Sequence, residues 1–238
     1  MKTALCFTGT ARSLQYTHNN IKEKLINSLE ECDIFAFLAE NPHAYKFKDL
    51  LGDNVQIKKI IIEEELDCDI SKIKFAPGWP PKTSSREIYI KMIRSRQRCE
   101  EILSLYEKEE GVNYERVIFS RLDVKYFDDV GPHVKNLNHG CLYVPDFHNT
   151  FGGVIEGHND RFAIGNRKDM RIYFNVPNSI EEFNKKGGQI TAETLLKWHL
   201  ERSAVQVEKI PLRFTRVRAT GEEIDLRLKD RSLHPRDT

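Results

Sequence analysis

Short apolar runs alternate along the chain with longer segments in which apolar residues recur every three or four positions. The short runs predict β-strands, and the longer segments predict amphipathic helices. Because the two kinds alternate, we expect an α/β fold whose mostly parallel sheet carries helices on both faces. The expected strands are residues 3–7, 33–38, 55–62, 116–119, 141–144, 161–164 and 205–210. The expected helices are residues 11–30, 44–51, 84–110, 167–174 and 191–202.

Terminal signals support two of these helices. Ser84-Ser85-Arg86-Glu87 has the form of a capping box at the start of the long helix. Gly111 is placed to end the same helix, and Thr191 is placed as the N-cap of the later one. The segment before the long helix, residues 63–82, contains the run Pro77-Gly78-Trp79-Pro80-Pro81 and is expected to be irregular.

Length and composition narrow the class of protein. The 238 residues suit one large α/β domain or two small ones, and the net charge of +1 gives no reason to expect nucleic acid as a partner. No apolar run approaches the ~20 residues that span a bilayer, so no transmembrane segment is expected. The first residues predict a strand rather than a signal peptide. Five dispersed cysteines without a Cys-x-x-Cys pair favour free thiols, a reducing compartment and a cytoplasmic location.

The turn after the first strand is Thr8-Gly9-Thr10-Ala11-Arg12. Small residues let a ligand approach the backbone, a helix N-terminus favours anions, and Arg12 could add a charged fork to a phosphate. A tight turn with a surface arginine is the other interpretation. The turn has neither the Gly-x-Gly-x-x-Gly pattern of dinucleotide-binding folds nor the Gly-Lys-Ser/Thr ending of a P-loop.

Arg121-Leu122-Asp123 follows the central apolar run, residues 117–119. Alternation along a strand places Arg121 and Asp123 on the same side. A carboxylate at a strand end can bind a divalent cation together with substrate phosphates, whereas a simple surface ion pair is the alternative. Gly9, Glu40 and Asp123 each come just after a predicted strand, so one crevice at the carboxyl edge of the sheet could collect all three.

Two further segments carry candidate polar chemistry. Asn159-Asp160 precedes a short apolar strand, and amide and carboxylate groups are natural partners for sugar hydroxyls, although Asn-Asp is also common in turns. Glu193 begins a helix, where it is either a dipole-stabilised residue or a general base aimed into the crevice. Arg216 and Arg218 share a face after the last strand and could clamp a diphosphate or line an exposed edge.

Taken in order, these segments resemble a nucleotide-sugar-dependent glycosyltransferase of the GT-A fold, with a Rossmann-like nucleotide-binding half. The likeness is to small enzymes of bacterial surface-polysaccharide clusters and of large algal viruses, and it covers roughly residues 1–220. It is carried by the strand, Gly-x-x-Arg turn and helix at the start, the long helix, and three later segments. These are Tyr114-Glu115-Arg116-Val117-Ile118-Phe119-Ser120-Arg121-Leu122-Asp123, Asn159-Asp160-Arg161-Phe162-Ala163-Ile164-Gly165 with Met170 and Tyr173, and Glu193-Thr194-Leu195-Leu196.

The resemblance implies a role for each candidate residue. The family's Asp-x-Asp motif falls on Arg121-Leu122-Asp123, so Asp123 is the expected ligand of a divalent metal, Mn²⁺ or Mg²⁺. Arg121 replaces the first aspartate and is expected to contact the ribose or a phosphate. Asp160 is expected to orient the donor sugar, and Glu193 is the expected catalytic base, with Asp160 as the second choice. The residues expected to bind the donor are Thr8, Gly9, Thr10, Arg12, Glu40, Arg121, Leu122, Asn159, Asp160 and Arg218.

The function implied is transfer of a sugar from a nucleoside-diphosphate donor to a glycan hydroxyl, metal-dependent and with inversion. The donor is expected to be UDP-linked, with glucose or a deoxysugar such as rhamnose. We expect a nucleotide-binding half over residues 1–125, a sugar and acceptor half over 126–220, and a charged surface segment over 221–238. A non-catalytic nucleotide- or glycan-binding domain of a larger polysaccharide-synthesis protein, a sugar nucleotidyltransferase and a sulfotransferase are the alternatives. Further domains of a larger glycosyltransferase stay open as partners.

Overall fold

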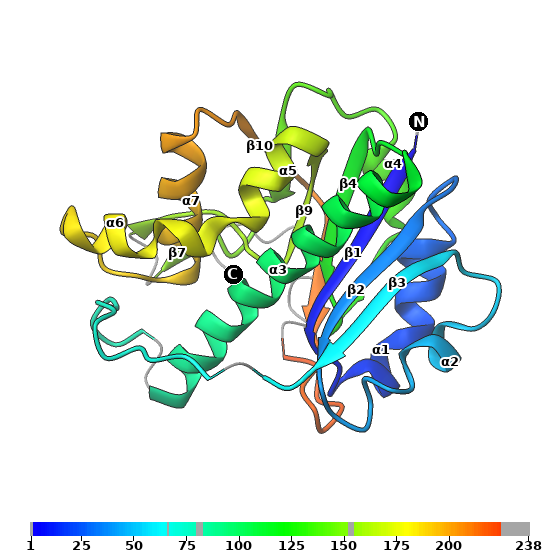
Figure 1. Ribbon diagram of the computed structural model, residues 1–238, viewed down its shortest axis with the longest axis horizontal. Coiled ribbons are helices and arrows are strands. Elements are labelled where there is room, and N and C mark those ends of the chain that lie inside the picture. Colours follow the sequence, from blue (N-terminus) through cyan, green and yellow to red (C-terminus); the bar gives the residue numbers. More distant parts are fainter. Residues whose placement is uncertain (1, 66, 80–82, 152–154, 225–238) are drawn as a thin grey trace.

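The apolar runs of the sequence form a seven-stranded mixed sheet in the order β10-β6-β9-β4-β1-β2-β3. A computed structural model describes residues 2–65, 67–79, 83–151 and 155–224 (Figure 1). The expectation of an α/β fold with a mostly parallel sheet is confirmed, since β1, β2, β3 and β4 all run in parallel. The strands are β1 (Thr3–Thr10), β2 (Asp33–Ala39), β3 (Ile57–Glu63), β4 (Arg116–Arg121), β6 (Leu142–Pro145), β9 (Phe162–Asn166) and β10 (Val207–Ile210).

Strand β9 runs antiparallel to its neighbours β4 and β6. The chain reaches β9 from β6 through a loop and the small hairpin of β7 (Thr150–Phe151) and β8 (Ile155–Glu156). Without a crossover helix between them, β6 and β9 meet as antiparallel neighbours, because a parallel pair needs a long connection that returns to the same edge of the sheet.

One face of the sheet packs on short helices. These are α1 (Leu14–Asn20), the π-helix η1 (Ile21–Ile26), α2 (Phe47–Leu51) and α4 (Val130–Val134). The predicted helix 11–30 is therefore shorter than expected and changes to π geometry at Ile21. The change coincides with a clamp, since the Asn20 amide donates to the Tyr126 carbonyl at 3.0 Å and accepts from the Tyr126 N–H at 2.7 Å. Local interruptions of this kind are where π turns occur in helices.

The opposite face carries α3 (Thr83–Glu110), which crosses β1 and β2, and a group of helices beside it (Figure 1). That group is α5 (Arg167–Phe174), the 3-10 turn η2 (Val176–Ser179), α6 (Ile180–Lys185) and α7 (Ala192–Arg202). As predicted, α3 ends before Gly111, which has φ +63°, and Thr191 caps α7. Helix α3 begins one residue before its predicted cap, Ser84.

A second, two-stranded sheet brings the end of the described chain back to the middle of the molecule. Strand β11 (Phe214–Arg216) pairs with β5 (Val124–Tyr126), which directly follows β4. The Val217 N–H then donates to the Asp123 carbonyl at 2.8 Å, and the Ser13 hydroxyl donates to the Val217 carbonyl at 2.7 Å. Residues 217–219 therefore lie beside the turn after β1. Of the predicted charged segment, residues 221–238, the part from residue 225 onward falls outside the described residues.

Among the residues that the structure describes, no helix is long and apolar enough to cross a membrane.

Candidate functional site

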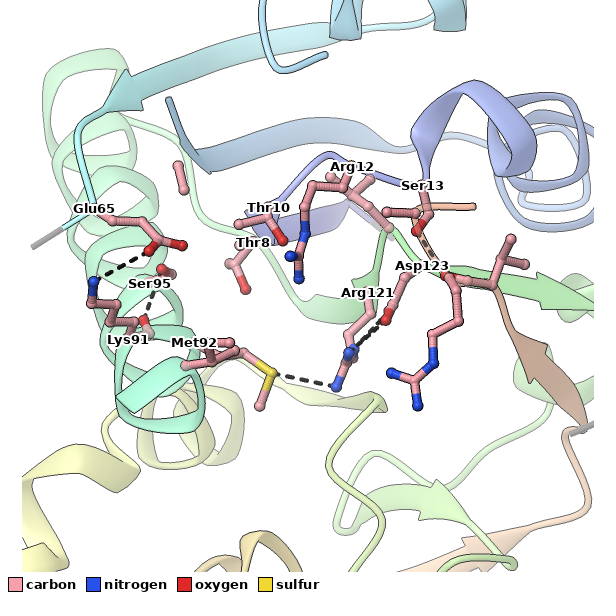
Figure 2. Close-up of a pocket in the computed structure, with 17 residues that line it drawn as sticks. Thr8, Thr10, Arg12, Ser13, Glu65, Lys91, Met92, Ser95, Arg121 and Asp123 are labelled. Carbon is pink, nitrogen blue, oxygen red and sulfur yellow. Dashed lines mark hydrogen bonds and ion pairs between the residues drawn. The ribbon is translucent and has the colours of Figure 1, made fainter. Parts of the chain in front are cut away.

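A cleft opens at the carboxyl ends of β1 and β4. This is the edge where ligands bind in open α/β sheets. The cleft collects residues from the turn after β1, the end of β4, one face of α3 and the segment after β11 (Figure 2). Its lining includes Thr8, Gly9, Thr10, Arg12, Glu65, Ile88, Lys91, Met92, Ser95, Arg121, Leu122, Asp123 and Arg218.

The end of β1 and the turn that follows it form one side of the cleft. Gly9, predicted in the turn, belongs to β1 and has φ +98°, a backbone conformation that residues other than glycine rarely adopt, although a Cβ there would have space. Among the described residues, the buried Thr8 hydroxyl has no hydrogen-bond partner, and the Arg12 side chain is exposed. This segment thus offers a ligand a hydroxyl group and a guanidinium, and the pairing of Thr8 with Arg121 across β1 and β4 places both at one level of the sheet.

Arg121 and Asp123 form a two-point ion pair at the end of β4. The Arg121 Nε donates to Asp123 Oδ1 at 2.8 Å, and Nη2 donates to Oδ2 at 2.6 Å. Burial alone would raise the pKa of the Asp123 carboxyl, but Arg121, Arg216 and Arg161 hold it below its usual range. Asp123 is therefore an ionised carboxylate whose two oxygens both accept from Arg121.

This arrangement does not fit a cation held by the protein. Mg²⁺ and Mn²⁺ take several oxygen ligands, usually from carboxylates that face the ion together with phosphates. In the described parts of the chain, no group of three or more His, Cys, Asp or Glu residues could hold a metal ion. The one other carboxylate among the residues that line the cleft, Glu65, pairs with Lys91 at 3.3 Å on the wall formed by α3 (Figure 2).

The cleft is positively charged. It is lined by Arg12, Lys91, Arg121 and Arg218 against the two carboxylates of Glu65 and Asp123, a surplus of two positive charges. Arg12 and Arg218 are exposed, and within the described residues neither side chain makes an ion pair. A cleft with this charge attracts anions and raises their local concentration.

A second cluster of charged residues lies buried between α3, β9 and α7. Arg96 donates from Nη2 to the Asp160 carboxylate at 2.8 Å and to its carbonyl at 2.6 Å. The guanidinium also lies over the rings of Phe119 and Tyr173, at 4.8 and 5.6 Å from their centres. Burial would raise the pKa of Asp160, but Arg96, Arg161 and Arg121 outweigh it and lower the pKa to about 2. Asp160 is thus an ionised carboxylate that is paired with Arg96.

Glu193 and Arg161 are the less satisfied members of this buried cluster. Arg161 Nη2 lies 4.0 Å from Glu193 Oε1, and Arg161 Nη1 lies 4.0 Å from Asp160 Oδ1, longer than hydrogen bonds. Three buried atoms have no hydrogen-bond partner among the described residues, namely Arg161 Nε and Nη1 and Glu193 Oε2. Burial raises the pKa of Glu193, with Arg161 lowering it and Asp160 raising it. Orphaned donors and an orphaned acceptor side by side are groups that a hydroxyl could satisfy.

Gly157 sets the close approach of the β8–β9 loop to α7. A Cβ at this position would come within 2.4 Å of the Glu193 backbone. The next residue, His158, donates its N–H to the Glu193 carbonyl at 3.1 Å. No local pattern in the sequence predicts this contact.

The structure brings most of the predicted donor-binding residues together and leaves three elsewhere. Thr8, Gly9, Thr10, Arg12, Arg121, Leu122 and Arg218 line the cleft, together with the predicted metal ligand Asp123. Glu40, Asn159 and Asp160 do not line it, and neither does the predicted base Glu193. The Leu122 side chain is buried in the core, although the residue borders the cleft. Asn159 is buried, donating to the Phe147 carbonyl at 2.8 Å and accepting from the Arg161 N–H at 2.9 Å. Glu40 is exposed at the end of β2, where its carboxylate accepts from the Tyr45 hydroxyl.

Sequence reasoning missed the α3 wall of the cleft and the role of Arg161 in the buried cluster. Lys91, Met92 and Ser95 recur at helical spacing, but only the position of α3 across the strand ends directs them into the cleft. Arg161 follows the predicted Asp160 directly, yet its neighbour Glu193 lies on helix α7, 32 positions later in the chain.

Comparison with known families places the chain in one of them. It belongs to the family described as Domain of unknown function (DUF7796), whose model matches residues 1–221. No curated protein matches the chain.

Proposed function

We propose that this member of a family of unknown function is a glycosyltransferase that uses a nucleoside-diphosphate sugar. The observation that supports the proposal is the cationic cleft at the carboxyl edge of the sheet. It lies next to the buried cluster of charged residues, Arg96, Asp160, Arg161 and Glu193. The proposed donor is UDP-linked, with glucose or a deoxysugar such as rhamnose, and the acceptor is a glycan hydroxyl. The mostly parallel sheet, with β3, β2, β1 and β4 in the order of a Rossmann-like half, is compatible with the GT-A fold.

The cleft supports binding of a diphosphate. Its four cationic side chains come from four separate segments and exceed the carboxylates by two charges, so a bound anion would be surrounded rather than touched on one side. The planar guanidinium group of arginine matches phosphate oxygens in geometry, and the absence of a side chain at Gly9 lets a ligand approach the backbone. The orphaned Thr8 hydroxyl adds a neutral hydrogen-bonding group.

Glu193 is the proposed general base, ahead of Asp160. A base must accept a proton, and the pKa of Asp160, lowered to about 2, makes it a poor acceptor. Glu193 has a raised pKa and an oxygen without a partner. In the proposed step, the acceptor hydroxyl oxygen bonds to the anomeric carbon while its proton passes to Glu193. The bond from that carbon to the diphosphate oxygen breaks, and its electron pair leaves with the diphosphate, which gives inversion.

Arg161 is proposed to position the hydroxyl that Glu193 deprotonates. Its Nε and Nη1 groups are buried and have no acceptor in the part of the chain that the structure describes, and the same side chain lies 4.0 Å from Glu193. A hydroxyl between the two would accept from Arg161 and donate to Glu193.

Calorimetric titration with UDP, GDP, CDP and dTDP tests the proposal. We expect one of them to bind in the micromolar range, and Arg12→Ala to weaken that binding. Arg98→Ala is the matched control, because Arg98 lies on α3 outside the cleft and pairs with Glu63 and Glu101. Absence of binding by all four diphosphates would contradict the proposed donor site and leave glycan binding as the hypothesis to test.

A further inference from the structure

We infer that Arg12, Arg121 and Arg218 neutralise the charge of the donor diphosphate, and that Asp123 is a positioning residue for Arg121 instead of a metal ligand. The inference rests on the proposed function, because it concerns how that donor is held. It makes donor binding independent of a divalent cation.

The first support is the geometry of the Arg121–Asp123 pair. Two parallel hydrogen bonds of 2.8 and 2.6 Å fix the guanidinium plane, so its orientation is set by Asp123. Within the described residues, the remaining polar contact of the Arg121 side chain is weak, from Nη1 to the Met92 sulfur at 3.4 Å. Nη1 thus has no strong acceptor in the described residues and faces the cleft that Met92 also lines. A phosphate oxygen would supply that acceptor.

The second support is the set of atoms that a cation would need. A metal at Asp123 would have to share its oxygens with Arg121, whose positive charge lies within hydrogen-bonding distance. Repulsion between the cation and the guanidinium opposes this arrangement. Glu65 lies on the opposite wall of the cleft from Asp123 and is paired with Lys91, so the two carboxylates do not converge (Figure 2).

The third support is the position of the arginines, which line the same cleft in which a metal would act. Arg12 comes from the turn after β1 and Arg218 from the segment after β11, and both line the cleft with exposed side chains. Together with Arg121 they surround the cleft from three segments. Fixed positive side chains can stabilise a leaving diphosphate as a metal does, since both act by placing positive charge where negative charge develops.

The test compares binding of the preferred nucleoside diphosphate in EDTA and in Mn²⁺. For the unaltered protein, we expect the two dissociation constants to agree within about threefold. In EDTA, Arg121→Ala should weaken binding by about 10- to 100-fold, the loss expected for a charge-assisted hydrogen bond. Mn²⁺ should recover part of this loss, because the substitution leaves the Asp123 carboxylate unpaired. Circular dichroism confirms that each variant is folded, and Arg218→Ala provides an independent variant whose loss should be the same in EDTA and Mn²⁺.

The possible outcomes distinguish failure of the inference from failure of the proposed function. Binding by the unaltered protein that EDTA abolishes and Mn²⁺ restores would overturn the inference and leave the proposed function standing. Binding in EDTA that Arg121→Ala leaves unchanged would also overturn it. If the diphosphate binds under neither condition, the proposed function and the inference both fall.

Discussion

Two arginine–aspartate pairs lie close together in this molecule and differ mainly in burial. The side chains of Arg121 and Asp123 are 22% and 26% exposed and border the cleft, whereas those of Arg96 and Asp160 are 1% and 3% exposed. The shortest nitrogen–oxygen distances are alike, at 2.6 and 2.8 Å. The same chemical pair can therefore serve a ligand in one setting and hold the fold together in the other.

Burial decides how much each pair contributes to stability. Breaking a buried pair leaves an uncompensated charge away from water, which is expensive, whereas a solvated pair is worth little. Arg96 is also enclosed by Phe119 and Tyr173, so it cannot turn to water when its partner is removed. The exposed pair can instead exchange some of its contacts for those of a ligand.

Removing one carboxylate from each pair should give clearly unequal losses of stability. We expect Asp160→Ala to lower the free energy of unfolding by about 3–5 kcal/mol. Asp123→Ala should lower it by about 1 kcal/mol or less, because its pair is partly exposed. Urea unfolding of both variants measures the difference. Equal losses would mean that burial does not separate the two pairs.

The buried pair should also give the protein a characteristic sensitivity to acid. The folded-state pKa of Asp160, about 2, lies below the ordinary 3.8, so its stabilisation is complete above about pH 4 and is lost as the pH falls through 2. The shift corresponds to about 2–3 kcal/mol. Asp160→Asn should remove this part of the decline in the free energy of unfolding between pH 4 and pH 2. A decline as steep as that of the unaltered protein would show that Asp160 does not carry it.

The exposed arginines should affect binding without affecting stability. Arg12→Ala is expected to weaken diphosphate binding by about tenfold and to leave the free energy of unfolding unchanged within about 0.5 kcal/mol. The effect should shrink as salt is raised, since exposed charges are screened. Calorimetry at two salt concentrations measures this dependence, with Arg98→Ala as the control. A loss of affinity that does not change with salt would argue that Arg12 acts through structure and not through its charge.

The sequence predicted those helices and strands that are determined by their own residues. The Thr191 cap and the 3.6-residue periodicity of residues 167–174 fixed α7 and α5. The apolar run that ends at Arg121 fixed β4 and the edge where the cleft lies. The π turn at Ile21 depends on Tyr126, which lies more than 100 positions away, so no local pattern could reveal it.

The candidate site was predicted in part for the same reason. Arg12 follows β1, Arg121 ends β4 and Arg218 follows β11, so the ends of these strands bring the three side chains to one cleft. Glu40 also follows a strand, but it does not line the cleft, and its exposed carboxylate accepts from the Tyr45 hydroxyl. The direction of β9 and the meeting of Arg161 with Glu193 depend on how α7 packs against the β8–β9 loop, which no spacing in the sequence encodes.

The glycosyltransferase proposal is tested most directly by following the reaction of a sugar nucleotide over time by NMR, in the presence of glycan acceptors. The sugar nucleotide used is the one whose nucleoside diphosphate binds in the titration. The unaltered protein should release the nucleoside diphosphate and form a glycoside of inverted anomeric configuration. Glu193→Gln should bind the donor with similar affinity. It should release the nucleoside diphosphate at no more than about one hundredth of the rate of the unaltered protein, because the proton acceptor is gone. A donor that binds and is never consumed, or equal rates for both proteins, would contradict the account.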